Sequence, residues 1–186
     1  MDAHPSMLYR AFRSKWETYV PRVATWRPPG HVPYVVDNLW EWVRPEECPT
    51  RRTAAFASPS SAEAKADGRI FVYRLSLPAG STVAQLNGLV DSKLHTEVDR
   101  LRDLIKKALD PAWFSKELTN KGSEASLFRP CLHAKEVDSI VSGSKILSGI
   151  GLREQIRYWS DIRLIALGEE ALAEVVPVVR TVFVFS

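Results

Sequence analysis

An arginine inside an apolar segment is the first residue of this sequence whose type and position suggest chemistry. Arg10 follows Tyr9 within Met7–Phe12, a short apolar and aromatic run that predicts a strand. A guanidinium among such neighbours is costly unless it meets an anion or reaches solvent. Two interpretations therefore stand side by side. In the first, Arg10 pairs with a surface carboxylate at the end of the strand. In the second, its planar guanidinium binds a phosphate group.

A group of serines follows the second predicted strand. Thr53–Ala57 reads as a strand and leads into Ser58-Pro59-Ser60. Ser60, with Glu63 three residues later, forms a capping box that predicts a short helix and explains this serine without any catalytic role. Ser58, at the end of a strand, is well placed to orient a second polar side chain by a hydrogen bond.

These two segments together carry a family resemblance. Tyr9-Arg10 in a first strand and Ser58-x-Ser60 closing the next resemble the start of the arginine-serine-glutamate class of ADP-ribosyltransferases, over roughly residues 7–66. The resemblance implies that Arg10, beside Tyr9, holds the phosphates of NAD, and that Ser58 orients a later glutamate. That glutamate would stabilise the oxocarbenium-like transition state while the nicotinamide–ribose bond breaks. Pro59 stands where the family usually has threonine, which is a departure.

The resemblance also requires a glutamate in the C-terminal part, and Glu154 is the first choice. It follows the glycine-rich Gly149–Gly151 and precedes Ile156–Ile165, which the pattern predicts to be a strand. The family often has a glutamate or glutamine two residues earlier, where this chain has Leu152, so the acceptor of the ADP-ribose stays open. Glu154 could equally be an exposed helix residue. The other candidates are Glu136, Glu169 and Glu170.

Aromatic side chains are the second group that could contact such a ligand. The chain has six tryptophans, most of which should pack in the core. Trp40 and Trp42 are the first candidates for stacking on nicotinamide or adenine. Both lie in Val35–Val43, where the pattern predicts a short helix with Asp37 or Asn38 near its start.

Two other functions compete with NAD cleavage. A protein-interaction module would use the tryptophan-rich N-terminal third. A nucleic-acid-binding domain would use Arg51-Arg52 and Lys106-Lys107 together with exposed aromatic side chains, and would need these residues to form one positive face. The NAD interpretation implies a toxin or phage-defence effector with a macromolecular acceptor, and such an effector would call for a neutralising protein partner.

The surrounding pattern shows which elements must position these residues. Arg69–Leu77, Thr82–Leu86 and Val178–Phe185 are predicted strands, and the last of them should lie in the middle of a sheet. Val98–Leu109 has the 3.6-residue period of an amphipathic helix ended by Pro111. Short helices are expected at residues 134–141 and 169–175. Strands, then helices, then strands predict an α+β fold with a split, antiparallel-rich sheet. We expect one domain over residues 1–186, with a helical insertion at about 91–142.

Length and composition limit the class of protein to which the chain can belong. The chain has 186 residues, a net charge of +3 and 45% hydrophobic residues, which suits one globular domain. Cys48 and Cys131 are far apart, and the four histidines form no ligand pair, so we expect no metal site. No apolar run approaches the length of a membrane span and no signal peptide is recognisable. These features predict a cytoplasmic protein without a membrane segment.

Overall fold

The chain forms two compact units in a computed structural model, which describes residues 8–13, 15, 26, 30, 32–58, 60–65, 70–75, 82–86, 94–117, 120–166 and 181–185. The strand unit comprises Met1–Thr25, Glu47–Ser92 and Asp161–Ser186. The helical unit comprises Trp26–Glu46 and Lys93–Ser160. The insertion expected at about 91–142 lies largely within the helical unit, which also includes an earlier segment and continues to Ser160.

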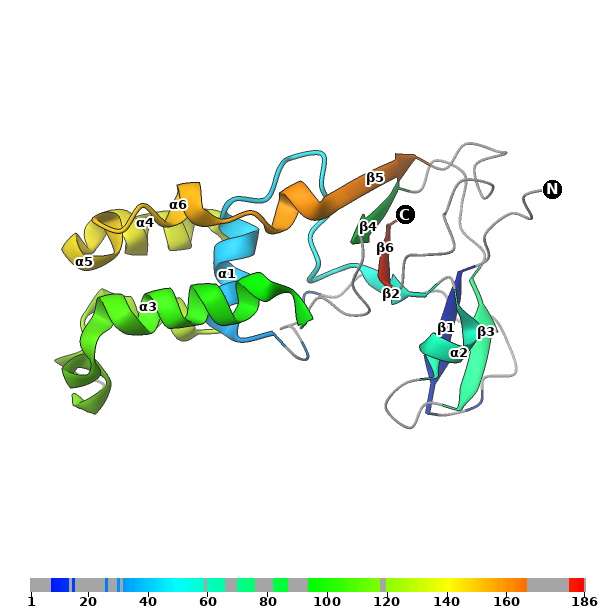
Figure 1. Cartoon of the computed structure of the whole chain (residues 1–186), viewed down its shortest axis with the longest axis horizontal. Helices are drawn as coiled ribbons and strands as arrows, with labels where there is room; N and C mark the ends of the chain where they lie inside the picture. The colour runs from blue at the N-terminus through cyan, green and yellow to red at the C-terminus, as the bar shows by residue number, and fades with distance from the viewer. Residues whose placement is uncertain are drawn as a thin grey trace. The chain divides into compact units, whose positions relative to one another are not determined.

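The helical unit is built around its first helix. Its elements are α1 (Tyr34–Trp42), α3 (Thr96–Ser115), the 3-10 helix η3 (Ser123–Phe128), α4 (Ala134–Gly143), α5 (Lys145–Ser148), α6 (Leu152–Gln155) and the 3-10 helix η4 (Tyr158–Asp161). Helix α1 contacts α3, α4 and η3, and lies between α3 and α4 in Figure 1. Every residue from Val35 to Glu41 is buried. This central helix therefore carries polar side chains, Asp37 and Asn38 among them, into the interior of the protein.

Helix α1 confirms the predicted helix over Val35–Val43 but begins differently. Pro33 occupies the N-cap position, and its carbonyl oxygen accepts hydrogen bonds from the backbone N–H groups of Val36 and Asp37, both at 3.0 Å. Asp37 lies in the first turn of the helix, as predicted, and its side chain and that of Asn38 are buried.

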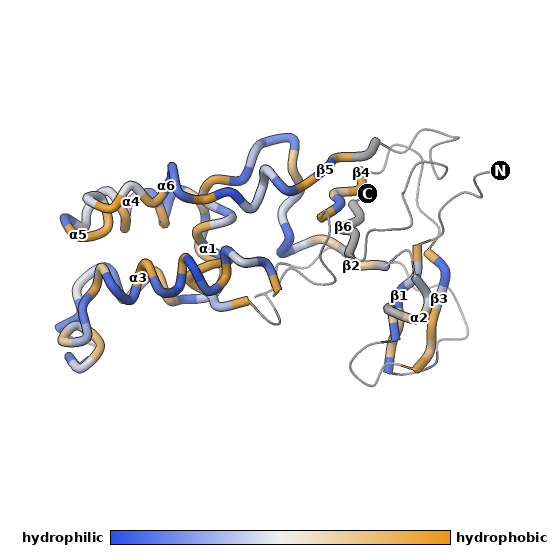
Figure 2. Tube along the Cα trace, viewed as in Figure 1, coloured by the Kyte–Doolittle hydropathy of each residue, from blue (hydrophilic) through white to orange (hydrophobic). Residues whose placement is uncertain are grey.

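Helix α3 has the predicted amphipathic pattern and a break where proline was expected to end it. Val98, Leu101, Ile105 and Leu109 are buried at spacings of three and four residues, and Figure 2 shows hydrophobic and hydrophilic positions alternating along the helix. Asp110 leaves the helical conformation, with φ 65° and ψ 147°. Pro111 then opens a further helical segment that ends at Ser115, a position where its fixed φ and missing N–H are tolerated.

The strand unit contains two antiparallel sheets. Strand β1 (Tyr9–Phe12) pairs with β3 (Phe71–Arg74). Strands β2 (Ala55–Ala57), β6 (Thr181–Phe185), β4 (Thr82–Leu86) and β5 (Ile162–Ala166) form a sheet in the order β2-β6-β4-β5, and α2 (Ser61–Ala64) follows β2. Strand β6 lies inside the sheet, as predicted from its β-branched and aromatic residues. The combination of helices with small antiparallel sheets agrees with the expected α+β class.

The strand predicted over Ile156–Ile165 begins later in the structure. The pattern placed a strand over Ile156–Ile165, whereas residues 158–161 form the 3-10 helix η4 and the strand begins only at Ile162. Tyr158 is fully buried within that turn, so its apolar ring serves packing between helices and not a sheet. The helix expected at residues 169–175 lies outside the described residues.

Candidate functional site

The arginine strand and the serine predicted to act with it are neighbours in the strand unit. Tyr9 and Ser58 form an antiparallel bridge: the Tyr9 N–H donates to the Ser58 carbonyl oxygen at 2.7 Å, and the Ser58 N–H donates to the Tyr9 carbonyl oxygen at 2.9 Å. Arg10, the next residue, is half-buried and its guanidinium carbon lies 5.2 Å from the centre of the Phe12 ring. Two residues that are 48 positions apart in sequence, Arg10 and Ser58, are thus held on adjoining strands.

Ser58 has a local role as well as this position. Its side chain is buried, with 6% exposure, and its Oγ accepts a hydrogen bond from the backbone N–H of Ser60 at 3.1 Å. That bond spans two residues and is typical of a serine turn. Helix α2 begins immediately afterwards, at Ser61. The Ser58 hydroxyl therefore contributes to this turn, and Pro59 lies outside the described residues.

The glutamate candidates differ sharply in their surroundings. Glu154 is exposed on the single turn of α6, which is the helix-surface alternative raised by the sequence. Glu136 is used at the start of α4: one oxygen accepts from the His133 backbone N–H at 2.8 Å and the other from Arg129 Nη2 at 3.2 Å. That arrangement is a helix cap. Glu169 and Glu170 lie outside the described residues.

The site residues named from sequence are divided between the two units. Tyr9, Arg10 and Ser58 belong to the strand unit, whereas Trp40 and Glu154 belong to the helical unit. Of these residues, the structure brings together the three in the strand unit.

Trp40 is a core residue of the helical unit. Its side chain has 0% exposure and stacks on Tyr158 with ring centroids 3.8 Å apart. Nothing of this ring is open to a ligand in the structure. Trp42, by contrast, is half-buried, donates from Nε1 to Asp138 Oδ1 at 3.0 Å and lies under the guanidinium of Arg153 at 4.4 Å.

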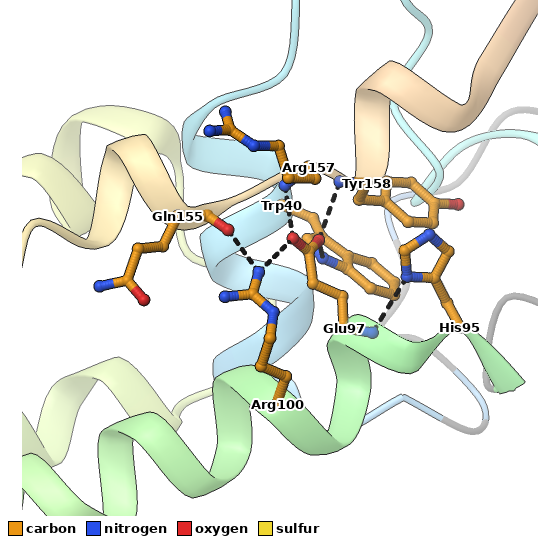
Figure 3. Close-up of polar contacts among 7 residues, drawn as sticks. All are labelled: Trp40, His95, Glu97, Arg100, Gln155, Arg157 and Tyr158. Carbon is orange, nitrogen blue, oxygen red and sulfur yellow. Dashed lines mark hydrogen bonds and ion pairs between the residues drawn. The ribbon is translucent and has the colours of Figure 1, made fainter.

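Glu97 is the residue with the most polar contacts that sequence reasoning missed (Figure 3). Its side chain has 2% exposure. Oε2 accepts from Trp40 Nε1 at 3.0 Å and from the Tyr158 N–H at 2.9 Å. Oε1 accepts from Arg100 Nη2 at 2.7 Å and from the Arg157 N–H.

These four donors saturate the carboxylate, so Glu97 is a structural group that ties α1, α3 and the segment before η4 together. His95 precedes it as the N-cap of α3, and its Nδ1 accepts from the Glu97 N–H at 3.2 Å. The sequence signal for Glu97 was His95, the capping residue that lies two positions before it at the start of α3.

The two basic pairs proposed for nucleic-acid binding differ in their exposure. Arg51 and Arg52 are buried, with 7% and 2% exposure, in the strand unit, whereas Lys106 and Lys107 are exposed on α3 of the helical unit. Buried guanidinium groups offer no accessible charge to a phosphate backbone. The expectation that this arginine pair contributes to a positive face was wrong.

Among the described residues, no three His, Cys, Asp or Glu side chains gather as a metal site, and no helix of the described part has the length and apolar character needed to cross a bilayer. No protein-family model, curated protein or solved structure matches the chain.

Proposed function

We propose that this chain is an NAD-consuming ADP-ribosyltransferase, with water or a macromolecule accepting the ADP-ribose. The observation that carries the proposal is the Tyr9–Ser58 bridge, since it sets the strand of Arg10 beside the residue that closes the next strand of the motif. In the arginine-serine-glutamate class these two positions act on one dinucleotide. We further propose a cytoplasmic effector with a neutralising protein partner.

Arg10 would hold the pyrophosphate. The residue is half-buried and its guanidinium lies beside the Phe12 ring, where partial desolvation would strengthen its attraction for an anion. The planar fork can make two parallel hydrogen bonds to phosphate oxygens, which a lysine cannot reproduce. Tyr9 would line the same part of the site. Ser58, whose hydroxyl accepts a hydrogen bond from the Ser60 backbone N–H, would orient the catalytic carboxylate.

Glu154 remains the proposed source of the charge that stabilises the transition state. It is exposed on α6 and makes no hydrogen bond or ion pair among the residues that the structure describes, in contrast to Glu136. A carboxylate near the nicotinamide ribose matters most as positive charge develops on that sugar, so its effect should be on turnover and not on NAD affinity.

The test is nicotinamide release from NAD, with and without a cell extract as a source of acceptor, together with calorimetric NAD binding. Arg10→Ala should weaken NAD binding about tenfold or more, and Arg10→Lys should restore only part of it. Arg13→Ala, which removes an exposed arginine three residues later, is the matched control and should bind NAD normally. Unchanged NAD affinity in Arg10→Ala would remove the arginine from the proposal.

The carboxylate is tested separately. Glu154→Gln should lower nicotinamide release about a hundredfold with little change in NAD affinity, as for the loss of one electrostatic contact to a transition state. Glu136→Gln is the control. Normal turnover in Glu154→Gln would exclude this residue and direct the same test to Glu169 and Glu170.

A protein-interaction module is the second candidate function, favoured by the aromatic groups exposed in the helical unit. Trp26 is 44% exposed and stacks on the exposed His133, and Tyr34 is 41% exposed. Large exposed aromatic side chains are enriched in interfaces. A wild-type protein that neither binds NAD nor releases nicotinamide under any condition would support this function in place of the enzyme.

A further inference from the structure

One face of the two-stranded sheet in the strand unit carries Arg10 among aromatic side chains. Strands β1 and β3 are antiparallel, and their register pairs Arg10 with Tyr73 and Phe12 with Phe71. Residues directly opposite each other in such a pair point to the same side of the sheet, as do residues two apart on one strand. The four side chains therefore share one face, and all four residues are half-buried.

Phe12 is in direct contact with the guanidinium of Arg10. The guanidinium carbon lies 5.2 Å from the centre of the Phe12 ring, within the distance of about 6 Å over which an aromatic ring attracts a cation. A carboxylate in the place of the ring would neutralise the charge that a phosphate has to meet. A ring holds the same group and leaves its positive charge in place, so this contact is compatible with binding an anion.

Tyr73 contacts the Phe12 ring from the neighbouring strand. The two ring centroids are 5.7 Å apart and the ring planes form an angle of 71°, the edge-to-face arrangement that aromatic pairs favour. Tyr73 is also the residue directly opposite Arg10. The Phe12 ring is therefore held between the guanidinium of its own strand and the tyrosine of the next one.

This arrangement bears on the cost of binding a phosphate. An arginine side chain has many rotamers, and fixing one of them costs up to about 2 kcal/mol in conformational entropy. A guanidinium that is already restricted before the ligand arrives loses less of this freedom on binding. The restriction must come from a contact that does not compete with the ligand, which is what the Phe12 ring offers.

We propose that Phe12 is a positioning residue for the phosphate-binding arginine. Its ring holds the guanidinium of Arg10 in the orientation that binds the pyrophosphate of NAD, and Tyr73 fixes the ring. This inference rests on the proposed function and adds to it the means by which Arg10 is preorganised. Leucine would pack against the sheet as an apolar residue, whereas positioning through the charge of Arg10 requires an aromatic ring.

The experiment compares replacements of Phe12 that keep or remove the ring. Phe12→Leu should weaken calorimetric binding of NAD about fivefold, and that of ADP-ribose by the same factor, because both ligands contain the pyrophosphate. KM for NAD should rise and kcat should stay unchanged. Phe12→Tyr keeps the ring and should bind both ligands as the wild type does. The unfolding temperature of each variant shows whether it is folded, and Tyr73→Leu, with an expected loss of about twofold to threefold, repeats the test if Phe12→Leu is not.

A double variant separates positioning from a general loss of packing. If Phe12 acts through the guanidinium, the variant with both Arg10→Ala and Phe12→Leu should bind NAD no more weakly than Arg10→Ala alone. An independent effect of Phe12 would weaken binding by the same factor with or without the arginine. Phe71→Leu is the matched control, since it makes the same change at a half-buried position directly opposite Phe12, and it should bind NAD normally.

The outcomes distinguish this inference from the proposed function. Normal NAD binding by Phe12→Leu, with a loss in Arg10→Ala, overturns the inference and leaves the proposed function intact. An equal loss in Phe12→Tyr or Phe71→Leu, or additive losses in the double variant, overturns it as well, because the effect is then not one of the ring on the arginine. Normal NAD affinity in Arg10→Ala, or a wild-type protein that does not bind NAD, overturns the inference together with the role proposed for Arg10.

Discussion

Glu97 and Asn38 of the helical unit and Gln85 of the strand unit are all buried, but they differ in their hydrogen bonds. In the helical unit, Glu97 accepts four hydrogen bonds and Asn38 makes three, so burial and bonding go together. In the strand unit, Gln85 is equally buried and neither of its amide atoms has a partner among the described residues. The difference teaches that burial of a polar group is not by itself a mark of function. A structural role follows where the fold completes the hydrogen bonds of the buried group, as it does for Glu97 and Asn38.

Asn38 is an example of a buried amide in the helical unit whose hydrogen bonds are supplied by the fold. Its Nδ2 donates to the carbonyl oxygens of Leu127 at 2.8 Å and Arg129 at 2.7 Å, and its Oδ1 accepts from the Leu132 N–H at 3.0 Å. The segment between η3 and α4 includes Cys131, at a positive φ of 57°, and has no regular hydrogen-bond ladder of its own. The Asn38 side-chain amide, on α1, supplies hydrogen-bond partners to that segment.

The largest effect should come from Glu97→Gln. Each carboxylate oxygen accepts two hydrogen bonds, so an amide nitrogen at either position faces two donors and leaves them unsatisfied. We expect a loss of about 4 kcal/mol in the free energy of unfolding, measured by urea titration with far-UV circular dichroism. Glu154→Gln, the same change at an exposed position, should stay within about 0.5 kcal/mol of the wild type. Equal stability of the two variants would break the comparison between the units.

Asn38→Ala should have the next largest effect, a loss of about 2 kcal/mol. The variant removes three hydrogen bonds and leaves a backbone N–H and two carbonyls near the core, and the better helix propensity of alanine offsets only a small part. Faster amide hydrogen exchange at Leu132 would localise the damage. Ser142→Ala is the control, because that hydroxyl is exposed and bonds only to carbonyls of its own helix. A control that loses as much stability would contradict the assigned role of Asn38.

The smallest effect, and one of opposite sign, is expected at the break in α3. Asp110 has φ 65° and ψ 147°, a backbone conformation that is costly for any residue except glycine. Asp110→Gly should raise the free energy of unfolding by about 0.5 kcal/mol, since relief of strain exceeds the few tenths lost with the cap on Ala112. Asp103→Gly, at an exposed helical position of the same helix, should instead lower it by about 0.5 kcal/mol. Two changes of the same sign would show that the break in α3 is not strained.

Local patterns predicted the elements better than they predicted contacts. The period of Val98–Leu109 gave α3, because an amphipathic helix needs only the spacing of its apolar residues. The strand Thr82–Leu86 was predicted with the bounds that the structure has. The strand over Ile156–Ile165 was overextended, because Tyr158 and Trp159 look like strand residues but are held by helices: Tyr158 stacks on Trp40, and Trp159 Nε1 donates to the Trp40 carbonyl oxygen at 2.7 Å.

The candidate site could be predicted only in part. Arg10 and Ser58 were identified as a pair from residue type and strand position, and the structure places their strands together. Trp40 was expected at a ligand because tryptophan often contacts one, yet its ring is enclosed by Tyr158 and His95 in a core that no sequence window reveals. Glu97 was overlooked because its donors come from residues 57 to 61 positions away as well as from its own helix.

The sequence by itself determined the periodic elements and the position of β6 inside a sheet, since these depend on side-chain type and short-range spacing. Only the tertiary structure decided which buried polar groups have a structural role. Whether Glu97, Asn38 or Gln85 is satisfied depends on donors and acceptors that reach it from distant segments. Hydrogen bonds act over about 3 Å, so that question is settled by the packing of elements and not by their order along the chain.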